Sequence, residues 1–208
     1  MKVLVFCDDV WHPSSVVKEG LSFLESKGYI FHWIEDTREW SPSNLFSYSI
    51  VILSKANNIS SQMENSWMTE EIEELFKKYV DRGGNLLVLH SGIAGYGQNV
   101  KLRSLMGGIF SFHPDQCLVN MIPASDHVLT RGSDTFSIKD EHYFVIIEDD
   151  NIDIFLTTES EHGTQPGGWK RYEGEGKVAV LTPGHNLEVW LNSSFQKILE
   201  NVFRWMNG

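Results

Sequence analysis

The chain has 208 residues, of which 41% are hydrophobic and 22% are charged, proportions that are ordinary for one globular domain over residues 1–208. Its formal net charge of −11 repels phosphate backbones and anionic lipids, so the composition argues against nucleic acid and membrane surfaces as partners. The two cysteines are too few for a disulfide framework, which favours reduced thiols and a cytoplasmic protein.

The first half of the chain alternates between apolar strands and amphipathic helices. Continuous apolar runs, typical of strands that are buried on both faces, predict strands over residues 2–6, 29–34, 49–53 and 85–90. The first of these runs is too short for the apolar region of a signal peptide. This alternation predicts an α/β fold in which a mostly parallel sheet has helices on both faces.

Local signals mark the ends of the helices between these strands. We expect Ser14 or Ser15 to cap the first helix and Gly28 to end it. Thr69 is expected to cap the second helix, which Gly83 ends.

The second half is richer in strands, which are predicted near residues 117–122, 143–147, 152–157 and 177–181, some of them antiparallel. An amphipathic helix capped by Ser193 or Ser194 closes the chain.

Polar side chains follow several of the predicted strands. Ligands of parallel α/β sheets bind outside the carboxyl ends of the strands, where His12, His90 and His185 are expected. His113 and the pair Asp140-Glu141 lie in connecting segments and can join them. Histidine exchanges protons near neutral pH or binds metals, and a neighbouring carboxylate can orient it or act as a base.

The turn after the central strand resembles a nucleophile elbow but lacks the sequence G-x-S-x-G. In proteins like the class I glutamine amidotransferases, this strand end presents a cysteine. Here the position is occupied by His90, and Cys7 and Cys117 lie elsewhere. The sequence therefore argues against a covalent thiol mechanism.

A series of short motifs runs along nearly the whole chain in one order. They are Trp11-His12-Pro13, the stretch from Tyr79 to Asn85 leading into Leu89-His90-Ser91-Gly92, Gly107-Gly108 with His113-Pro114, Asp140-Glu141-His142-Tyr143, Pro166-Gly167-Gly168-Trp169, Gly174-Glu175-Gly176 and Gly184-His185. Together they resemble the ThuA-like, trehalose-utilisation family of the class I glutamine amidotransferase-like superfamily. The resemblance implies a flavodoxin-like fold and a role in carbohydrate metabolism, through trehalose-related or 3-keto sugars.

The polar positions of that family correspond here to His90, His113, Glu141 and His185. We expect Glu141 to act as a general acid or base, and the histidines to polarise a sugar oxygen or, with Glu141, to hold a divalent metal such as zinc. The side chains expected to contact the carbohydrate are His12, Asp140, Tyr143 and Trp169, the two aromatic ones by stacking on the sugar ring.

The reaction stays open at this stage between hydrolysis and isomerisation of the sugar. A non-catalytic sugar-binding module is the alternative, because the nucleophile of the amidotransferase-like fold is missing. A structural subunit of a homo-oligomer is a third possibility, which exposed tryptophans would favour.

Overall fold

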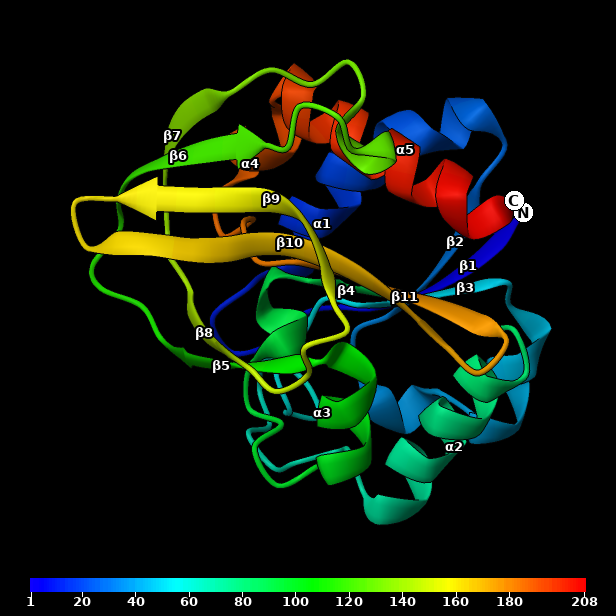
Figure 1. Ribbon diagram of the computed structural model, residues 1–208. Coiled ribbons are helices and arrows are strands. Elements are labelled where there is room, and N and C mark those ends of the chain that lie inside the picture. The colour runs from blue at the N-terminus through cyan, green and yellow to red at the C-terminus, as the bar shows by residue number, and fades with distance from the viewer.

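Five strands of the central sheet run parallel, as the alternation of strands and helices predicts. The computed structural model describes residues 1–208 (Figure 1). The parallel strands have the order β2-β1-β3-β4-β11, which is the 2-1-3-4-5 order of flavodoxin-like folds. Their bounds are β1 Lys2–Phe6, β2 Ile30–Ile34, β3 Ile50–Leu53, β4 Asn85–Leu89 and β11 Gly176–Leu181.

Four antiparallel strands extend this sheet beyond β11, which confirms the strand-rich second half. They follow in the order β10 (Gly163–Glu173), β9 (Asp153–Ser160), β6 (Cys117–Pro123) and β7 (Phe136–Asp140). A separate two-stranded sheet pairs β5 (Gly108–Phe112) with β8 (Phe144–Ile147). Strand β10 is the longest in the chain, although its Pro166-Gly167-Gly168 reads as a turn in the sequence. The strand accommodates these residues through shifts of register against β9.

Helices cover both faces of the sheet (Figure 1). On one face lie α1 (Ser14–Leu21), α4 (Leu187–Leu191) and α5 (Ser193–Asn207), and on the other lie α2 (Glu70–Asp81) and α3 (Val100–Met106). None of the helices combines the length and the apolar character that a membrane span requires.

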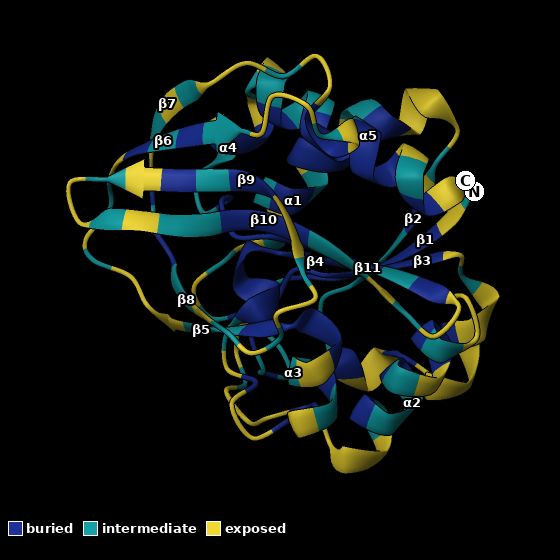
Figure 2. Ribbon diagram, viewed as in Figure 1, coloured by how far each residue is buried: buried dark blue, intermediate teal, exposed yellow.

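Two hydrophobic cores, of 26 and 22 buried residues, lie on the two sides of the sheet (Figure 2). Alternate side chains of a strand enter opposite cores. In β1, Val3 and Val5 belong to one core, and Leu4 and Phe6 belong to the other. Burial on both faces explains why the parallel strands read as continuous apolar runs.

The helix caps confirm some of the expected signals and correct others. Thr69 accepts a hydrogen bond from the backbone of α2, and Gly28 ends the first helical segment with a φ of 89°. Ser14 and Ser15 were the wrong choice for the first cap, because both lie inside α1. Ser193 and Ser194 were likewise wrong, because the side chain of Asn192 caps α5.

Candidate functional site

Three histidines from the carboxyl ends of three parallel strands come together at one rim of the sheet. His12 follows β1, His90 follows β4 and His185 follows β11. Their ring centroids are 4.8 Å apart for His12 and His90, 5.1 Å for His12 and His185, and 5.6 Å for His90 and His185. The topology alone brings these residues together across more than 170 positions of sequence.

Glu141, from the segment between β7 and β8, places its carboxylate against all three rings. Its oxygens lie 3.1 Å from His185 Nδ1, 3.4 Å from His90 Nε2 and 3.9 Å from His12 Nε2. Burial acts to raise the pKa of Glu141, but the three imidazoles outweigh it and hold the pKa well below its usual range. The side chain is therefore an anion at neutral pH.

The backbone at His90 adopts a conformation that directs the imidazole into this cluster. His90 has a φ of 45° and begins a short 3-10 turn directly after β4. The turn packs so closely on the end of β3 that a Cβ at Gly92 would lie 1.9 Å from the carbonyl oxygen of Leu53. The ring of His90 is buried, stacks on Tyr143 at 4.3 Å and contacts Thr182 O through Nδ1 at 2.8 Å.

Asp9 holds His12 in place, a role that the sequence analysis missed. Its Oδ1 lies 2.7 Å from His12 Nδ1 and accepts hydrogen bonds from the backbone of Trp11 and His12, while Oδ2 accepts from Ala56 N at 2.9 Å. Burial acts to raise the pKa of Asp9, but these hydrogen bonds lower it to about 2. The spacing Asp-x-x-His was the available signal, because a short side chain of this kind often bonds the backbone two or three residues on.

His113 lies beside the cluster, and the third histidine within the cluster is His12, where the sequence analysis expected His113. Its Nε2 is 3.7 Å from Glu141, but the side chain is 36% exposed and Nδ1 contacts Pro114 O at 2.8 Å. The four side chains whose ligand atoms lie within 4.8 Å of one another are His12, His90, Glu141 and His185.

Asp140 is fully buried, so the expectation that it contacts a substrate is wrong. Its oxygens accept hydrogen bonds from the backbone of Gly184 at 2.8 Å, His185 at 3.0 Å and Asn186 at 3.1 Å. Burial is the main influence on its pKa and raises it. Asp140 thus anchors the turn that carries His185, and it precedes Glu141 in the chain.

Trp169 also lies away from the rim, and its expected stacking on a sugar is wrong. The indole is fully buried in the core on the α2 and α3 side, and Nε1 donates to Met106 O at 2.8 Å. The glycines before it belong to strand β10 and not to a surface loop. Tyr143, the other aromatic residue of that expectation, does line the site.

A cavity of about 490 Å³ opens above the cluster. Its floor contains Glu141, His12 and His185, and aromatic side chains form its walls: Trp11, Phe110 and Tyr143, with His113 beside them. Trp11 is the only tryptophan among the exposed large hydrophobic residues, with 61% of its surface accessible. The exposed tryptophan that was expected to favour an oligomer therefore belongs to the cavity.

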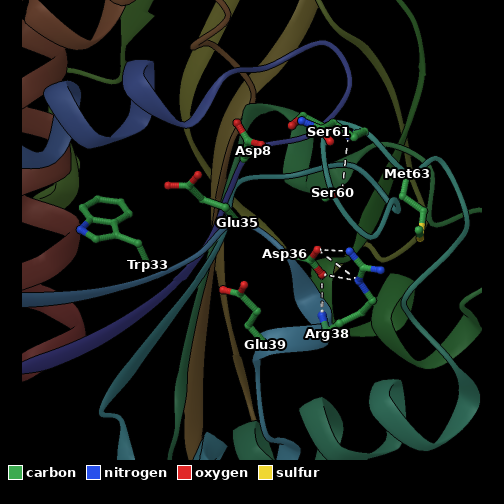
Figure 3. A pocket seen from close by; sticks show the side chains of 10 residues that line it. Asp8, Trp33, Glu35, Asp36, Arg38, Glu39, Ser60, Ser61 and Met63 are labelled. Atoms are coloured by element: carbon green, nitrogen blue, oxygen red, sulfur yellow. Dashed lines mark hydrogen bonds and ion pairs between the residues drawn. The ribbon is translucent and has the colours of Figure 1, made fainter.

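A second cavity, of about 480 Å³, lies beyond the carboxyl ends of β1 and β2, and four of the residues that line it are carboxylates (Figure 3). Three of these four carboxylates have partners of their own. Asp36 pairs with Arg38, Glu35 with Lys18, and Asp8 accepts a hydrogen bond from Ser14 N. No set of side chains converges there, so the histidine cavity is the candidate site.

The chain is similar to proteins of one family and to several solved structures. Residues 2–206 match a family model described as ThuA, trehalose utilisation. A ThuA-like protein from Parabacteroides merdae ATCC 43184 superposes with a TM-score of 0.79 at 16% identity, covering 99% of this chain and 89% of that one. A ThuA-like protein from Bacteroides uniformis ATCC 8492 superposes with a TM-score of 0.77 at 16% identity, and the match covers 99% of this chain and 91% of that one.

A cytoplasmic protein from Salmonella typhimurium LT2 has a TM-score of 0.73 at 12% identity, and the match covers 99% of each chain. No curated protein matches this chain closely enough to count as a relative. At these identities the solved structures show the fold alone.

Proposed function

The chain belongs to the trehalose-utilisation (ThuA) family, and from this premise we propose that its histidine-glutamate cavity binds and transforms a carbohydrate. The observation that carries the proposal is the combination of a charged floor and aromatic walls in one cavity. Its volume of about 490 Å³ falls in the range of small-molecule sites. Sugars present both hydroxyl groups, which bind carboxylates, and apolar ring faces, which stack on aromatic side chains.

The side chains divide between binding and proton transfer. Glu141 is held as an anion, so it accepts hydrogen bonds from hydroxyl groups and stabilises positive charge, and it is a poor proton donor. His113 stands at the wall with part of its ring in solvent, where an imidazole can take up and release protons during turnover. Trp11 extends the wall outward and offers its ring face to a sugar.

A trehalose-related sugar with a ketone at its third carbon suits this arrangement. The ketone acidifies the neighbouring C2–H bond, so a base such as His113 can remove that proton and leave an enolate. Return of the proton to another position isomerises the sugar. Departure of the glycosidic oxygen from C1 with a proton, followed by addition of water, hydrolyses it.

The test is turnover of a 3-keto-disaccharide by the purified protein, with the unmodified disaccharide measured in parallel. We expect E141Q and H113A to lose about 100-fold or more in kcat/KM, the usual scale of acid–base and electrostatic contributions. The matched control is H162A, which removes an exposed histidine outside the cavity. Absence of wild-type turnover, or full activity in both cavity variants, would contradict the proposal.

A sugar-binding module without catalysis is the second candidate, and one feature of the site favours it. The elbow after β4 presents a buried histidine and not a thiol, and Cys7 is itself buried. Calorimetry with a panel of sugars separates the two, because tight binding without turnover supports the module. We place either activity in the cytoplasm, in keeping with two cysteines that form no disulfide.

A further inference from the structure

The structure assigns a divalent cation site to His12, His90, His185 and Glu141, at the floor of the cavity. The ligand class is a first-row divalent cation such as zinc, because imidazole nitrogens and one carboxylate oxygen suit such ions. The inference concerns the same cavity as the proposed function, but cation binding is measured without a sugar and stands or fails separately.

The first argument is the hydrogen-bonding state of the rings. Nδ1 of His90 faces a backbone carbonyl, which only accepts hydrogen bonds, so this nitrogen carries the hydrogen. The neutral ring then directs the lone pair of Nε2 towards Glu141. Asp9 likewise holds a hydrogen on Nδ1 of His12, which faces a carboxylate oxygen, so Nε2 is the nitrogen of that ring that is available to a metal.

The second argument is that the nitrogens on the other side of these rings have no partner. His12 Nε2, His90 Nε2 and His185 Nδ1 are buried and make no hydrogen bond. All three face the Glu141 carboxylate at 3.1–3.9 Å without the geometry of a hydrogen bond. A divalent cation between these nitrogens and the carboxylate attracts all four groups, and its binding displaces any hydrogen that the ring nitrogens carry.

The third argument is distance. Ligand atoms about 2.0–2.1 Å from a tetrahedral zinc ion lie about 3.3–3.4 Å apart, and imidazoles bound in this way have ring centroids about 5 Å apart. The nitrogen-to-oxygen distances here are 3.1, 3.4 and 3.9 Å, and the ring centroids are 4.8, 5.1 and 5.6 Å apart. The three rings are also nearly perpendicular to one another, at 76–78°. The four ligand atoms lie within 4.8 Å of one another, so small rotations of the side chains bring them to the separations that one ion requires.

The position of the cluster also leaves the cation accessible to a ligand. Glu141, His12 and His185 line the cavity, so oxygen atoms of a bound molecule can reach the ion from that side. Some zinc sites expand from four to five ligands during a reaction. Vicinal oxygens, as in a hydroxyketone, are the groups that such a position favours.

The test uses protein stripped of metal with a chelator and then titrated with Zn²⁺ or Co²⁺ in a calorimeter. We expect one equivalent per chain, and with Co²⁺ the intense visible absorption of a tetrahedral or five-coordinate nitrogen-oxygen site. H185A and E141Q should lose this binding at least 100-fold. The matched control is H113A, which removes a histidine equally near Glu141 but outside the set of four and should bind as wild type does.

D9N tests the support of His12 separately, because loss of a carboxylate partner behind a ligating histidine lowers metal affinity about 10–100-fold. Thermal unfolding of each variant shows whether it has folded. Stripped wild-type protein that binds neither ion stoichiometrically would overturn the inference, as would equal loss of binding in H113A and H185A. Metal binding without sugar turnover would instead leave the cation site intact and contradict the proposed enzyme.

Discussion

Replacement of Asp140 tests whether one buried carboxyl group holds the turn that carries His185. Asp140 is fully buried, and its two oxygens accept three backbone hydrogen bonds from residues 184–186. D140A leaves three N–H groups without a partner. D140N keeps the oxygen that serves His185 and Asn186, but its NH₂ group faces the N–H of Gly184.

The expected cost follows from the number of groups left unpaired. A buried donor without a partner lowers stability by about 1–3 kcal/mol. Removal of the carboxyl group offsets part of this loss, because the free-energy cost of burying that group also disappears. We therefore expect D140A to lower the free energy of unfolding by about 4 kcal/mol and D140N by about 2 kcal/mol. In a domain of this size, 1 kcal/mol shifts Tm by roughly 2–4 °C, which gives a fall of about 8–16 °C for D140A and about 4–8 °C for D140N.

The assay is calorimetric or circular-dichroism unfolding of the two variants beside wild type. The matched control is D134N, which changes an exposed aspartate just before β7 and should leave Tm unchanged. An unchanged Tm in D140A would refute the reasoning, because three buried donors would then have found other partners. Equal losses in D140A and D140N would show that burial of the group matters and the number of hydrogen bonds does not.

Three further predictions concern other parts of the chain. G92A should be destabilised by several kcal/mol in urea unfolding, since its Cβ would overlap the Leu53 carbonyl oxygen, and a variant of wild-type stability would contradict the geometry of the turn. W11A should fold normally but raise KM for a sugar substrate about 5–10-fold, with W11F closer to wild type; an unchanged KM in W11A would exclude stacking there. Burial raises the pKa of the Cys7 thiol to about 12, so iodoacetamide at pH 8 should modify only Cys117 in folded protein, and mass spectrometry that finds Cys7 alkylated would disprove this.

The sequence was sufficient to predict those features of the fold that depend on local patterns. Continuous apolar runs identified the parallel strands, because such strands are buried on both faces. The rule that ligands bind at the carboxyl ends of parallel strands then placed His12, His90 and His185 at one rim without any knowledge of distances. Strand β10 was missed, because proline and glycine normally punctuate strands and here a shift of register accommodates them.

The errors within the site have a common physical cause. Residues near each other in sequence were expected to share an environment, yet Asp140 points into the protein while its neighbour Glu141 faces the cavity. The position expected for His113 within the cluster is occupied by His12 for a similar reason. Long-range packing decides which of the two histidines lies within the group around Glu141, and no local sequence pattern predicts such packing.

The cost of the buried cluster argues that it exists to bind something. Three buried ring nitrogens without partners cost about 1–3 kcal/mol each, against a total stability of about 5–15 kcal/mol for a typical domain. Asp9, Asp140 and the carbonyl of Thr182 nevertheless hold the rings in this arrangement. Apolar side chains in the same positions would fill the space without leaving buried polar atoms unpaired. A sugar hydroxyl has one hydrogen to donate and would satisfy one nitrogen at a time. A single cation would satisfy all three nitrogens and the carboxylate together, at the floor of the cavity whose aromatic walls would hold a sugar.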